Sequence, residues 1–588
     1  SVANEAKLPD KFSIISELAR RRGFFWQSYE IYGGISGFFT YGHLGAKLKQ
    51  NIEKKLRELF VNKLGIFEME SSIITPGVVF ESSGHVEHFK EPMVECLKCK
   101  KKFRADHLLQ EFAKMGETET EKMTLKEIRE AIEKNSVLCP DCGGKFDEPK
   151  QFLTMFKTTI GPYSETVGYG RPEAAQGIFV EFKRLYEIAR EKIPFGVLQI
   201  GHALRNEISP RQSLIRLREF TIADLEFFFD PEEPSCYRLK DVENETLRLV
   251  LAEHKLKGSE QITEVTVKEA LSRGYIKVEW QAFFMAYAKK LLIGLGIPAE
   301  KQRFIEKLPW ERAHYSQQSF DQQVYVERWG WVEVSGHAYR TDYDLKRHME
   351  YSGEDMRIYK DYEKPVEKEE LTIKPVVAKL GPLYKNETAK ILEMLKKADP
   401  KEVDASFGKN GFYMLGEYRI LPEHVEITRQ KVVERGKRFV PHVVEPSFGL
   451  DRLFYVTLEY AFRVKDDRTI LSFPRDIAPI QLGVYPLVNK DELPEKALEL
   501  HKLLTSEGFT VEYDDAGSIG RRYARADEIG IPLGITVDYQ TISDDSVTIR
   551  DRDSWKQVRT AIKDLPRLLH DYFRWKIDFE GLGKTLAE

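Results

Sequence analysis

The sequence predicts an α+β protein, in which an antiparallel β-sheet core with helices and insertions precedes a separate C-terminal α/β domain. A strand at 194–208 and a segment rich in β-formers and aromatic residues at 218–230 are joined by a polar loop, which favours an antiparallel pair. Near the C-terminus, strands alternate with helices, which is typical of a compact α/β domain. The chain has 588 residues and exceeds the roughly 250–300 that one core supports, so we expect several domains.

Residues 1–475 are predicted to form the sheet-based domain. Apolar residues at helical spacing predict a surface helix over 46–60, a strand is predicted to end at Pro76, and a further helix is predicted over 174–189. Three insertions are expected: the charged segment 96–149 between cysteine pairs, the largely helical segment 231–307, and the segment 349–438, which is rich in lysine and glutamate near its start.

Residues 476–588 are predicted to form the second domain, with the boundary near 472–476. We expect strands at 478–488, 509–515, 533–539 and 546–553. Helices are expected at 494–508 and 518–530, and a closing helix at 554–573.

The composition is that of a folded globular protein. Hydrophobic residues make up 42% and charged residues 31%, which argues against disorder. No membrane segment is expected, since no stretch approaches the roughly 18 uninterrupted apolar residues of a membrane span, and the N-terminal segment lacks the apolar run of a signal peptide. These features predict a cytoplasmic protein. The net charge of −4 gives no general attraction to polyphosphate, so an RNA partner would have to be bound by local basic patches.

The most informative motif is a pair of strands that could surround a nucleotide. Arg205 and Glu207 precede the polar loop, and Phe220 follows it on the next strand. A guanidinium donates to phosphate, a carboxylate accepts from an exocyclic amine, and an aromatic ring stacks on a base. Alone, this motif would be an ordinary surface hairpin, but GLDRLF at 449–454 adds Arg452 at the start of a predicted buried helix. Together they predict a nucleotide site.

The segment around Arg205 and Phe220 resembles motif 2 of the class II aminoacyl-tRNA synthetases, and GLDRLF resembles their motif 3. The resemblance implies that Arg205 binds the α-phosphate of ATP, Glu207 the adenine amino group and Phe220 the adenine ring. It further implies that Arg452 binds the γ-phosphate and that Arg216 helps to hold the bent triphosphate. Arg205 and Arg452 are therefore the expected catalytic residues, because they stabilise the charge of the transition state.

Two further features follow from this resemblance. Glu333, in GWVEVSGHAYR, lies where class II enzymes commonly use an acid to coordinate the Mg²⁺ that accompanies ATP, and a hard cation prefers such oxygen ligands. A structural strand glutamate is the alternative. The strand that ends at Pro76 resembles motif 1, whose proline lies at the family's dimer interface, so we expect a homodimer.

Within this class, the chain is similar to the glycyl-tRNA synthetases of the archaeal and eukaryotic homodimeric type. The matching segments are EIYGGISGFFTYGHLG at 30–45, SSGHVEHF at 82–89, RPEAAQGIF at 171–179, RNEISPR at 205–211, VVEPSFGLDR at 443–452 and AGSIGRRYARADEIGIP at 516–532. The insertions after 231 and 348 are matched less well. The resemblance implies activation of glycine with ATP and transfer of glycine to tRNA(Gly).

A glycine site must hold two charged ends and leave no volume at Cα, because glycine offers no side chain. The resemblance places Glu173, Glu445 and Ser447 around the amino group and Cα, and Arg340 on the carboxylate. The last acid of motif 2 is Asp224 here, whereas relatives have glutamate. We therefore expect a bridging water or a smaller contribution from Asp224.

Four of the five cysteines lie in two C-x-x-C pairs, Cys96 with Cys99 and Cys139 with Cys142. In a cytosolic protein this pattern predicts a metal site before disulfides, and four thiolates are typical of structural Zn²⁺. Four free thiols are the alternative, because the segment between the pairs exceeds the usual ribbon spacing. The basic residues beside the first pair, from Lys98 to Arg104, either contact the tRNA acceptor stem or form a solvated face.

The C-terminal domain resembles the anticodon-binding domain shared by the class IIa glycyl, prolyl, threonyl and histidyl enzymes. Arg521, Arg522 and Arg525 lie on its predicted second helix. Spaced arginines suit the phosphates and unpaired bases of an anticodon loop, so we expect tRNA contacts there. Docking between domains is the alternative role.

Two other functions compete with the glycyl-enzyme hypothesis. The first is another class IIa synthetase, against which the segments RPEAAQGIF and VVEPSFGLDR argue. The second is a non-catalytic nucleic-acid-binding relative, such as the accessory subunit of the mitochondrial replicative polymerase. Such proteins typically lose the ATP-site arginines, whereas Arg205 and Arg452 are both present.

Overall fold

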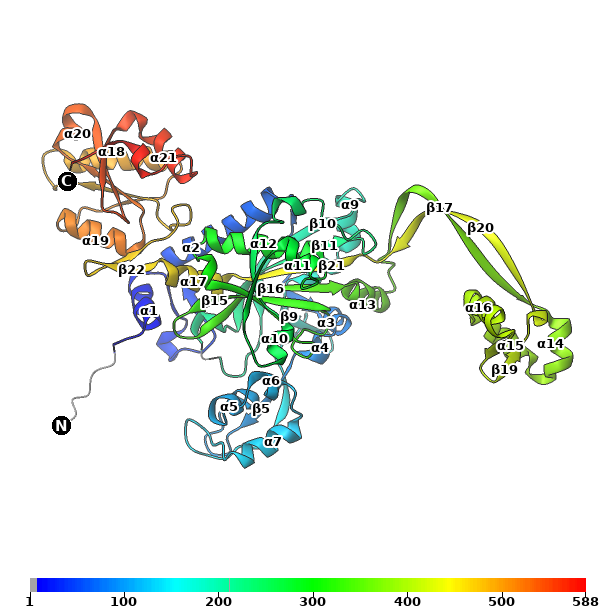
Figure 1. Cartoon of the computed structure of the whole chain (residues 1–588). Coiled ribbons are helices and arrows are strands. Elements are labelled where there is room, and N and C mark those ends of the chain that lie inside the picture. Colours follow the sequence, from blue (N-terminus) through cyan, green and yellow to red (C-terminus); the bar gives the residue numbers. More distant parts are fainter. Residues whose placement is uncertain (1–7, 211, 588) are drawn as a thin grey trace. The chain divides into compact units, whose positions relative to one another are not determined.

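The computed structural model describes residues 8–210 and 212–587 and divides the chain into two compact units, Ser1–Met356 with Pro441–Glu588, and Arg357–Val440. The first unit contains a nine-stranded sheet (Figure 1). In sheet order its strands are β13 (Ile262–Thr266), β12 (Thr246–Val250), β14 (Gln302–Glu306), β15 (Gln318–Val326), β16 (Gly330–Thr341), β21 (His442–Gly449), β11 (Glu219–Phe229), β10 (Phe195–Leu204) and β3 (Phe67–Glu68). Most neighbours are antiparallel, which confirms the predicted fold class.

Strands β10 and β11 form the antiparallel pair that the sequence predicts. Their register runs from Phe195 opposite Phe228 to Leu204 opposite Glu219. Strand β11 is covered on both faces: Phe227 packs against Trp280 on one side, and Phe228 packs against Phe182 on the other. Burial on both faces explains why its sequence is apolar almost throughout.

The helices that share one apolar core with this sheet include α2 (His43–Arg57), α12 (Glu279–Gly294) and α17 (Leu450–Ala461). Helix α2 confirms the helix predicted over 46–60, and its buried residues recur every three to four positions, as in Leu44, Leu48 and Ile52. Helix α17 begins directly after β21, so Arg452 lies in its first turn.

The segment 231–307 was expected to be a largely helical insertion, and this prediction missed three strands. Besides α10 (Ala252–Leu256), α11 (Val267–Ser272) and α12, it supplies β12, β13 and β14 to the central sheet. Each of these strands has only five residues, which is too short for a clear alternation of apolar and polar positions. Because α12 is buried almost all round, the segment belongs to the core of the domain.

The strand predicted to end at Pro76 is β4 (Ile74–Pro76), which pairs with β9 (Val167–Gly170). The helix predicted over 174–189 is divided into α8 (Ala175–Phe179) and α9 (Phe182–Ile188). The other elements around this sheet are α1 (Lys11–Arg22), β1 (Phe25–Gln27), β2 (Phe39–Tyr41), α3 (Gly77–Ser83), α4 (His85–His88), β8 (Lys157–Thr159), α13 (Tyr343–Ser352), β22 (Phe462–Lys465) and β23 (Arg468–Leu471).

The cysteine-bearing segment folds as a small module with its own apolar core. Strand β5 (Lys90–Glu95) lies between β6 (Lys102–Arg104) and β7 (Lys150–Leu153). Helices α5 (Ala105–Phe112), α6 (Glu117–Glu121) and α7 (Leu125–Lys134) complete it. Val94, Phe103, Leu109 and Ile128 contribute to its core.

The second unit, Arg357–Val440, is built on two long antiparallel strands, β17 (Ile358–Pro375) and β20 (Val425–Phe439). They lead to a group of short elements: α14 (Val377–Tyr384), α15 (Thr388–Lys397), α16 (Pro400–Asn410), β18 (Tyr413–Leu415) and β19 (Tyr418–Ile420). Leu380, Ile391 and Leu395 lie in its own apolar core. Strand β17 is largely exposed and rich in charge, so its sequence lacks the apolar alternation that predicts a strand.

The C-terminal domain has a six-stranded sheet of order β25-β24-β26-β27-β28-β29. Its elements are β24 (Leu482–Pro486), α18 (Leu493–Ser506), β25 (Val511–Tyr513), α19 (Ile519–Ile529), β26 (Leu533–Val537), α20 (Tyr539–Asp544), β27 (Ser546–Asp551), β28 (Gln557–Ala561), α21 (Leu565–Phe573) and β29 (Lys584–Thr585). The closing helix predicted over 554–573 is wrong in its first half, where β28 pairs with β27. Pro566 lies at the start of α21, because proline is tolerated only in the first turn of a helix.

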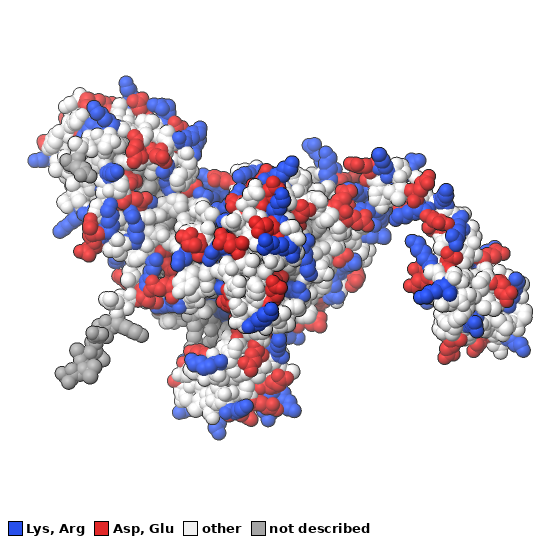
Figure 2. All heavy atoms as spheres, viewed as in Figure 1, with Lys and Arg blue, Asp and Glu red and all other residues white. Residues whose placement is uncertain are grey.

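Charged side chains of both signs are interspersed over the face of the molecule seen in Figure 2, in keeping with the small net charge. Among the described residues, no helix has both the length and the apolar composition needed to span a bilayer.

We expect Leu380→Asp to unfold the unit Arg357–Val440, because Leu380 is fully buried in that unit's own core and an unpaired buried carboxylate is costly. Leu383→Asp is the matched control, since Leu383 lies on the same helix and is 58% exposed. Limited proteolysis followed by mass spectrometry should show rapid cleavage within 357–440 for the first variant only. Equal protease resistance of the two variants would contradict a separate core.

Candidate active site

A cavity of about 330 Å³ collects most of the residues that the sequence predicts to bind ATP and glycine. Its lining comes chiefly from β11, β16, β21, the start of α17 and the polar loop between β10 and β11. The predicted residues that line it are Glu173, Arg205, Glu207, Arg216, Phe220, Glu333, Glu445, Ser447 and Arg452. Segments far apart in the sequence therefore meet at one place, as the hypothesis of a joint ATP and glycine site requires.

Three guanidinium groups, those of Arg205, Arg216 and Arg452, line this cavity. Arg205 Nε donates to the backbone oxygen of Pro172 at 3.2 Å. Arg452 Nη1 donates to the backbone oxygen of Glu333 at 2.9 Å. Burial lowers the pKa of Arg452, and the positive charges of Arg216 and Arg205 lower it further, against the opposing charge of Glu333. Cations gathered in this way are complementary to a polyanion such as a triphosphate.

Two aromatic rings lie beside the first of these arginines. The guanidinium carbon of Arg205 is 5.3 Å from the centroid of Phe220 and 5.5 Å from that of Phe89. Both rings and Glu207 line the cavity. The arrangement provides flat faces and an acceptor for a purine next to the phosphate-binding cations. Phe89 was not singled out from the sequence, although it ends the segment SSGHVEHF.

The polar loop after β10 is held in place by Arg218. Its Nε donates to the backbone oxygen of Glu207 at 3.0 Å, and its Nη2 donates to that of Ile208 at 3.2 Å. Its Nη1 donates to the backbone oxygen of Ser36 at 2.8 Å. Arg218 therefore fixes the loop that carries Glu207 and joins it to the N-terminal segment.

Glu333 shares its part of the cavity with Asp321, for which the sequence predicts no metal-binding role. A methyl group added at Gly336 would lie 3.6 Å from Glu333 Oε1 and 3.9 Å from Asp321 Oδ1, so both carboxylates face this glycine. Burial, and then the charge of Glu333, raises the pKa of Asp321 to about 7, whereas Lys307 at 3.6 Å opposes this rise. Two carboxylates beside the arginine-lined cavity are a donor set that fits a hard divalent cation.

The opposite part of the cavity is a niche lined by acids. Glu173 Oε1 accepts from Gln176 Nε2 at 2.9 Å and lies 3.2 Å from His85 Nε2. Burial alone would raise the pKa of Glu173, but the charges of His85 and Arg340 outweigh it and hold this pKa well below its usual range. Glu173 is therefore ionised, and an ammonium is the ligand that such a niche favours.

Arg340 does not fit its predicted role as the ligand of the glycine carboxylate. Its side chain is 0% exposed, and its donors are used by three acids: Asp344 at 2.8 Å, Glu445 at 3.0 Å and Glu173 at 3.4 Å. The ring of Tyr315, which lines the cavity, lies 3.5 Å from its guanidinium carbon. Arg340 thus contacts the acids of the niche and does not itself line the cavity.

Asp224 is also buried behind the niche, where its carboxylate accepts from Ser447 Oγ at 2.5 Å and from Ala174 N at 2.7 Å. Burial, and then the charge of Glu173, raises the pKa of Asp224 to about 6. The shorter side chain therefore orients Ser447 and does not itself line the cavity.

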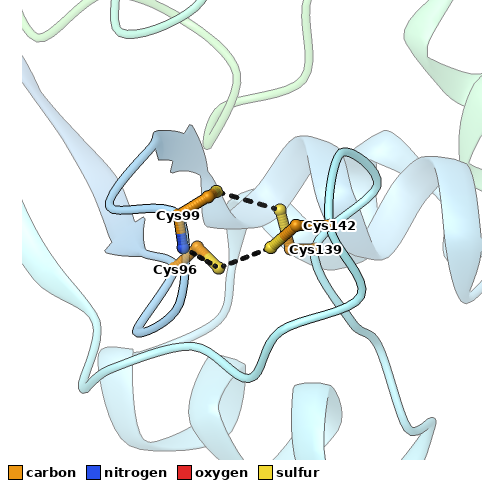
Figure 3. Close-up of side chains that lie close together, drawn as sticks. All are labelled: Cys96, Cys99, Cys139 and Cys142. Carbon is orange, nitrogen blue, oxygen red and sulfur yellow. Dashed lines mark hydrogen bonds between the residues drawn. The ribbon is translucent and has the colours of Figure 1, made fainter.

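The four paired cysteines converge from two loops of the small module (Figure 3). Their sulfur atoms all lie within 4.8 Å of one another, with Cys96 Sγ 3.4 Å from Cys142 Sγ and Cys99 Sγ 3.7 Å from Cys139 Sγ. Four thiolates around a tetrahedral Zn²⁺, each about 2.3 Å from the metal, would be about 3.8 Å apart. The cluster therefore has a geometry that could hold a metal ion.

Two of the three arginines expected to contact tRNA have structural roles inside the C-terminal domain. Arg522 is buried and donates to backbone oxygens, including those of Asp515 at 3.0 Å and Gly517 at 2.9 Å. Arg525 pairs with Asp514 at 2.7 Å. Both arginines hold the loop before α19. A sequence pattern does not show such contacts, because they form only when the loop folds back onto the helix. Only Arg521 is exposed among these three.

Comparisons with known proteins cover both the C-terminal domain and the whole chain. A family model described as an anticodon binding domain matches residues 481–572. The solved structure of prolyl-tRNA synthetase from Cryptosporidium parvum, complexed with L-proline and AMP, superposes with a TM-score of 0.51 at 13% identity, covering 98% of this chain and 80% of that chain. This similarity shows the fold, that of a class II synthetase.

Close relatives decide between the remaining alternatives. A protein of Pyrococcus horikoshii named glycine–tRNA ligase is 47% identical over 566 residues, which is 96% of this chain and 98% of the relative. A relative of the same name from Aeropyrum pernix is 45% identical, over 98% of this chain and 99% of the relative. Another, from Methanocaldococcus jannaschii, is 44% identical, over 95% of this chain and 98% of the relative. The similarity spans all of the site segments, so the chain belongs to the glycine–tRNA ligase family.

Proposed function

We propose that this chain activates glycine with ATP to form glycyl-adenylate and transfers the glycyl group to the 3′ end of tRNA(Gly). The observation that carries the proposal is one cavity in which the guanidinium groups of Arg205, Arg216 and Arg452 lie beside the carboxylates of Glu173 and Glu445. The cations match a triphosphate and the acids match an ammonium, which are the charges of the two small substrates.

At the ATP end, Arg205 binds the α-phosphate, Arg452 the γ-phosphate, and Arg216 the bent triphosphate between them. The adenine ring stacks on Phe220, and Glu207 accepts from its amino group. Supporting this assignment, all five side chains line the same cavity.

At the glycine end, Glu173 and Glu445 bind the ammonium, and Ser447 closes the space at Cα. Asp224 and Arg340 do not contact the substrate. Asp224 orients Ser447, and Arg340 orients Glu173 and Glu445. Because Arg340 is buried, the glycine carboxylate would lie beside Arg205, where it can approach the α-phosphate.

The first reaction needs no protein nucleophile. The glycine carboxylate attacks the α-phosphorus of ATP, pyrophosphate leaves, and Arg205 and Arg452 stabilise the negative charge that develops on the phosphate oxygens. Asp321 and Glu333 would hold Mg²⁺, which when bound neutralises charge on phosphate oxygens. In the second reaction, a terminal ribose hydroxyl of tRNA attacks the carbonyl carbon of the adenylate and AMP leaves.

The C-terminal domain would bind the anticodon arm of tRNA, with Arg521 as the exposed basic residue of α19. A homodimer would form through the strand that ends at Pro76, where the apolar side chains of Ile73, Ile74 and Val78 are 39%, 46% and 52% exposed. We further propose a structural Zn²⁺ on the four cysteines and a cytoplasmic location, where reducing conditions keep the thiols available.

ATP–pyrophosphate exchange tests the proposed function directly. We expect glycine, among the twenty amino acids, to support exchange, because the chain belongs to the glycine–tRNA ligase family and the acids of the niche match an ammonium. Exchange that depends on proline or threonine, or no exchange with any amino acid, would overturn the assignment.

Arg205→Ala should lower the rate of glycine-dependent exchange by roughly 10²–10³-fold, the usual cost of losing one group that stabilises transition-state charge. Arg184→Ala is the matched control, since this arginine on α9 is exposed and outside the cavity. Circular dichroism should show both variants folded. An Arg205→Ala protein that fails to fold would reassign the residue to structure.

Elemental analysis of the purified protein should find about one zinc per chain, because four thiolates complete a tetrahedral site. Cys99→Ser is expected to lose the metal and to make residues 90–153 sensitive to protease. Cys236→Ser, at the lone buried cysteine outside the cluster, should keep it. Zinc retained at wild-type level in Cys99→Ser would contradict the proposed zinc site on the four cysteines.

A further inference from the structure

Glu226 is a buried acid whose presence the proposed roles do not explain. It lies in β11 of the central sheet and is 0% exposed. Within the described part of the chain, neither of its carboxylate oxygens accepts a hydrogen bond. An ionised carboxylate that accepts no hydrogen bond costs far more to bury than a neutral carboxyl group.

The sheet register places Glu226 directly opposite Glu445. Strand β11 pairs with β21 so that Asp224 is opposite Ser447 and Phe227 is opposite Val444, and the same register brings Glu226 to Glu445. Residues opposite each other in an antiparallel pair point to the same face, with Cβ atoms about 4.5–5.5 Å apart. The hydrogen bond of 2.5 Å between Ser447 and Asp224 shows that side chains of the adjacent cross-strand pair do meet on this face.

Two buried carboxylates opposite each other cannot both be ionised without strong repulsion. The groups that face this pair are Asp224 on β11, Arg340 on β16 and Glu173 before α8. Burial raises the pKa of Glu445 to about 8, whereas the charge of Arg340 and the hydrogen bond of Glu226 lower it. Arg340 Nη1 donates to Glu445 Oε2 at 3.0 Å. Burial, and then the charge of Glu445, raises the pKa of Glu226 well above its usual range.

We propose that Glu226 is a positioning residue, whose neutral carboxyl group donates a hydrogen bond to Glu445 and holds that carboxylate for the substrate ammonium. Arg340 and Glu226 then fix Glu445 from two directions, while its remaining acceptor capacity is directed into the cavity. The proposal rests on the glycine-binding role of Glu445 given above and extends the niche by one residue that does not line the cavity.

The test compares Glu226→Gln with Glu226→Leu in ATP–pyrophosphate exchange. The amide of glutamine donates as the neutral acid does, so its KM for glycine should stay within about threefold of wild type. Leucine fills similar space without a donor, so KM for glycine should rise roughly tenfold or more, the usual effect of losing a hydrogen bond to a charged group. The kcat and the KM for ATP should change by less than about threefold.

Equal KM values for glycine in wild type and Glu226→Leu would overturn the proposal, as would a glutamine variant as impaired as the leucine variant. A parallel rise in KM for ATP would indicate a general structural defect and would also overturn it. If wild type shows no glycine-dependent exchange, the proposed function fails instead.

A second measurement covers the case in which Glu226→Leu does not fold. The infrared difference spectrum of wild type minus Glu226→Gln should contain the carbonyl band of a neutral carboxylic acid. A difference that contains only carboxylate bands would show that Glu226 is ionised and would contradict the proposal, whatever the kinetics.

Discussion

The buried guanidinium of Arg340 is shared by Asp344, Glu445 and Glu173, and the acid-lined niche depends on this contact. Carboxylates taken out of water lose their hydration, and several of them in one place repel each other unless a cation is held among them. Breaking a buried pair of this kind by removing one partner costs about 3–5 kcal/mol, because the other charge stays uncompensated. Arg340 thus acts on two acids that line the cavity: with His85 it holds the pKa of Glu173 well below its usual range, and it opposes the burial that raises the pKa of Glu445 to about 8.

The arginines of the cavity lie apart from the acids of the niche. The pairing of the strands in the sheet places those acids. Strand β21 pairs with β11 on one side and with β16 on the other, so Ser447 lies opposite both Asp224 and Gly336. This register fixes the positions of Asp224 on β11 and Glu445 on β21 relative to each other. The cations come instead from the ends of elements: Arg205 follows β10, Arg216 lies in the loop, and Arg452 is in the first turn of α17. In the proposed function, the rigid strands would therefore hold glycine and the loop would hold ATP.

The three insertions differ in whether they belong to the central sheet, reach the cavity or form a separate unit. The segment 231–307 is part of the central sheet and core, and its helix α12 supports the strands beneath the cavity. The cysteine-bearing module has a separate core but reaches the cavity, since His107 Nε2 lies 3.5 Å from Arg216 Nη1. Arg357–Val440 has its own core and is a unit by itself.

The sequence by itself determined the residue types of the site, the strand pair around the polar loop, the cysteine cluster and the resemblance to a family, because these depend on local spacing and on motifs. It could not show β12 to β14 or β28, whose short patterns are ambiguous until neighbouring strands pair with them. Nor could it show that Arg340 and Arg522 use their donors inside the protein, or that Glu226 faces Glu445. Those outcomes depend on contacts between residues that folding brings together, and burial changes both the availability and the charge of each group.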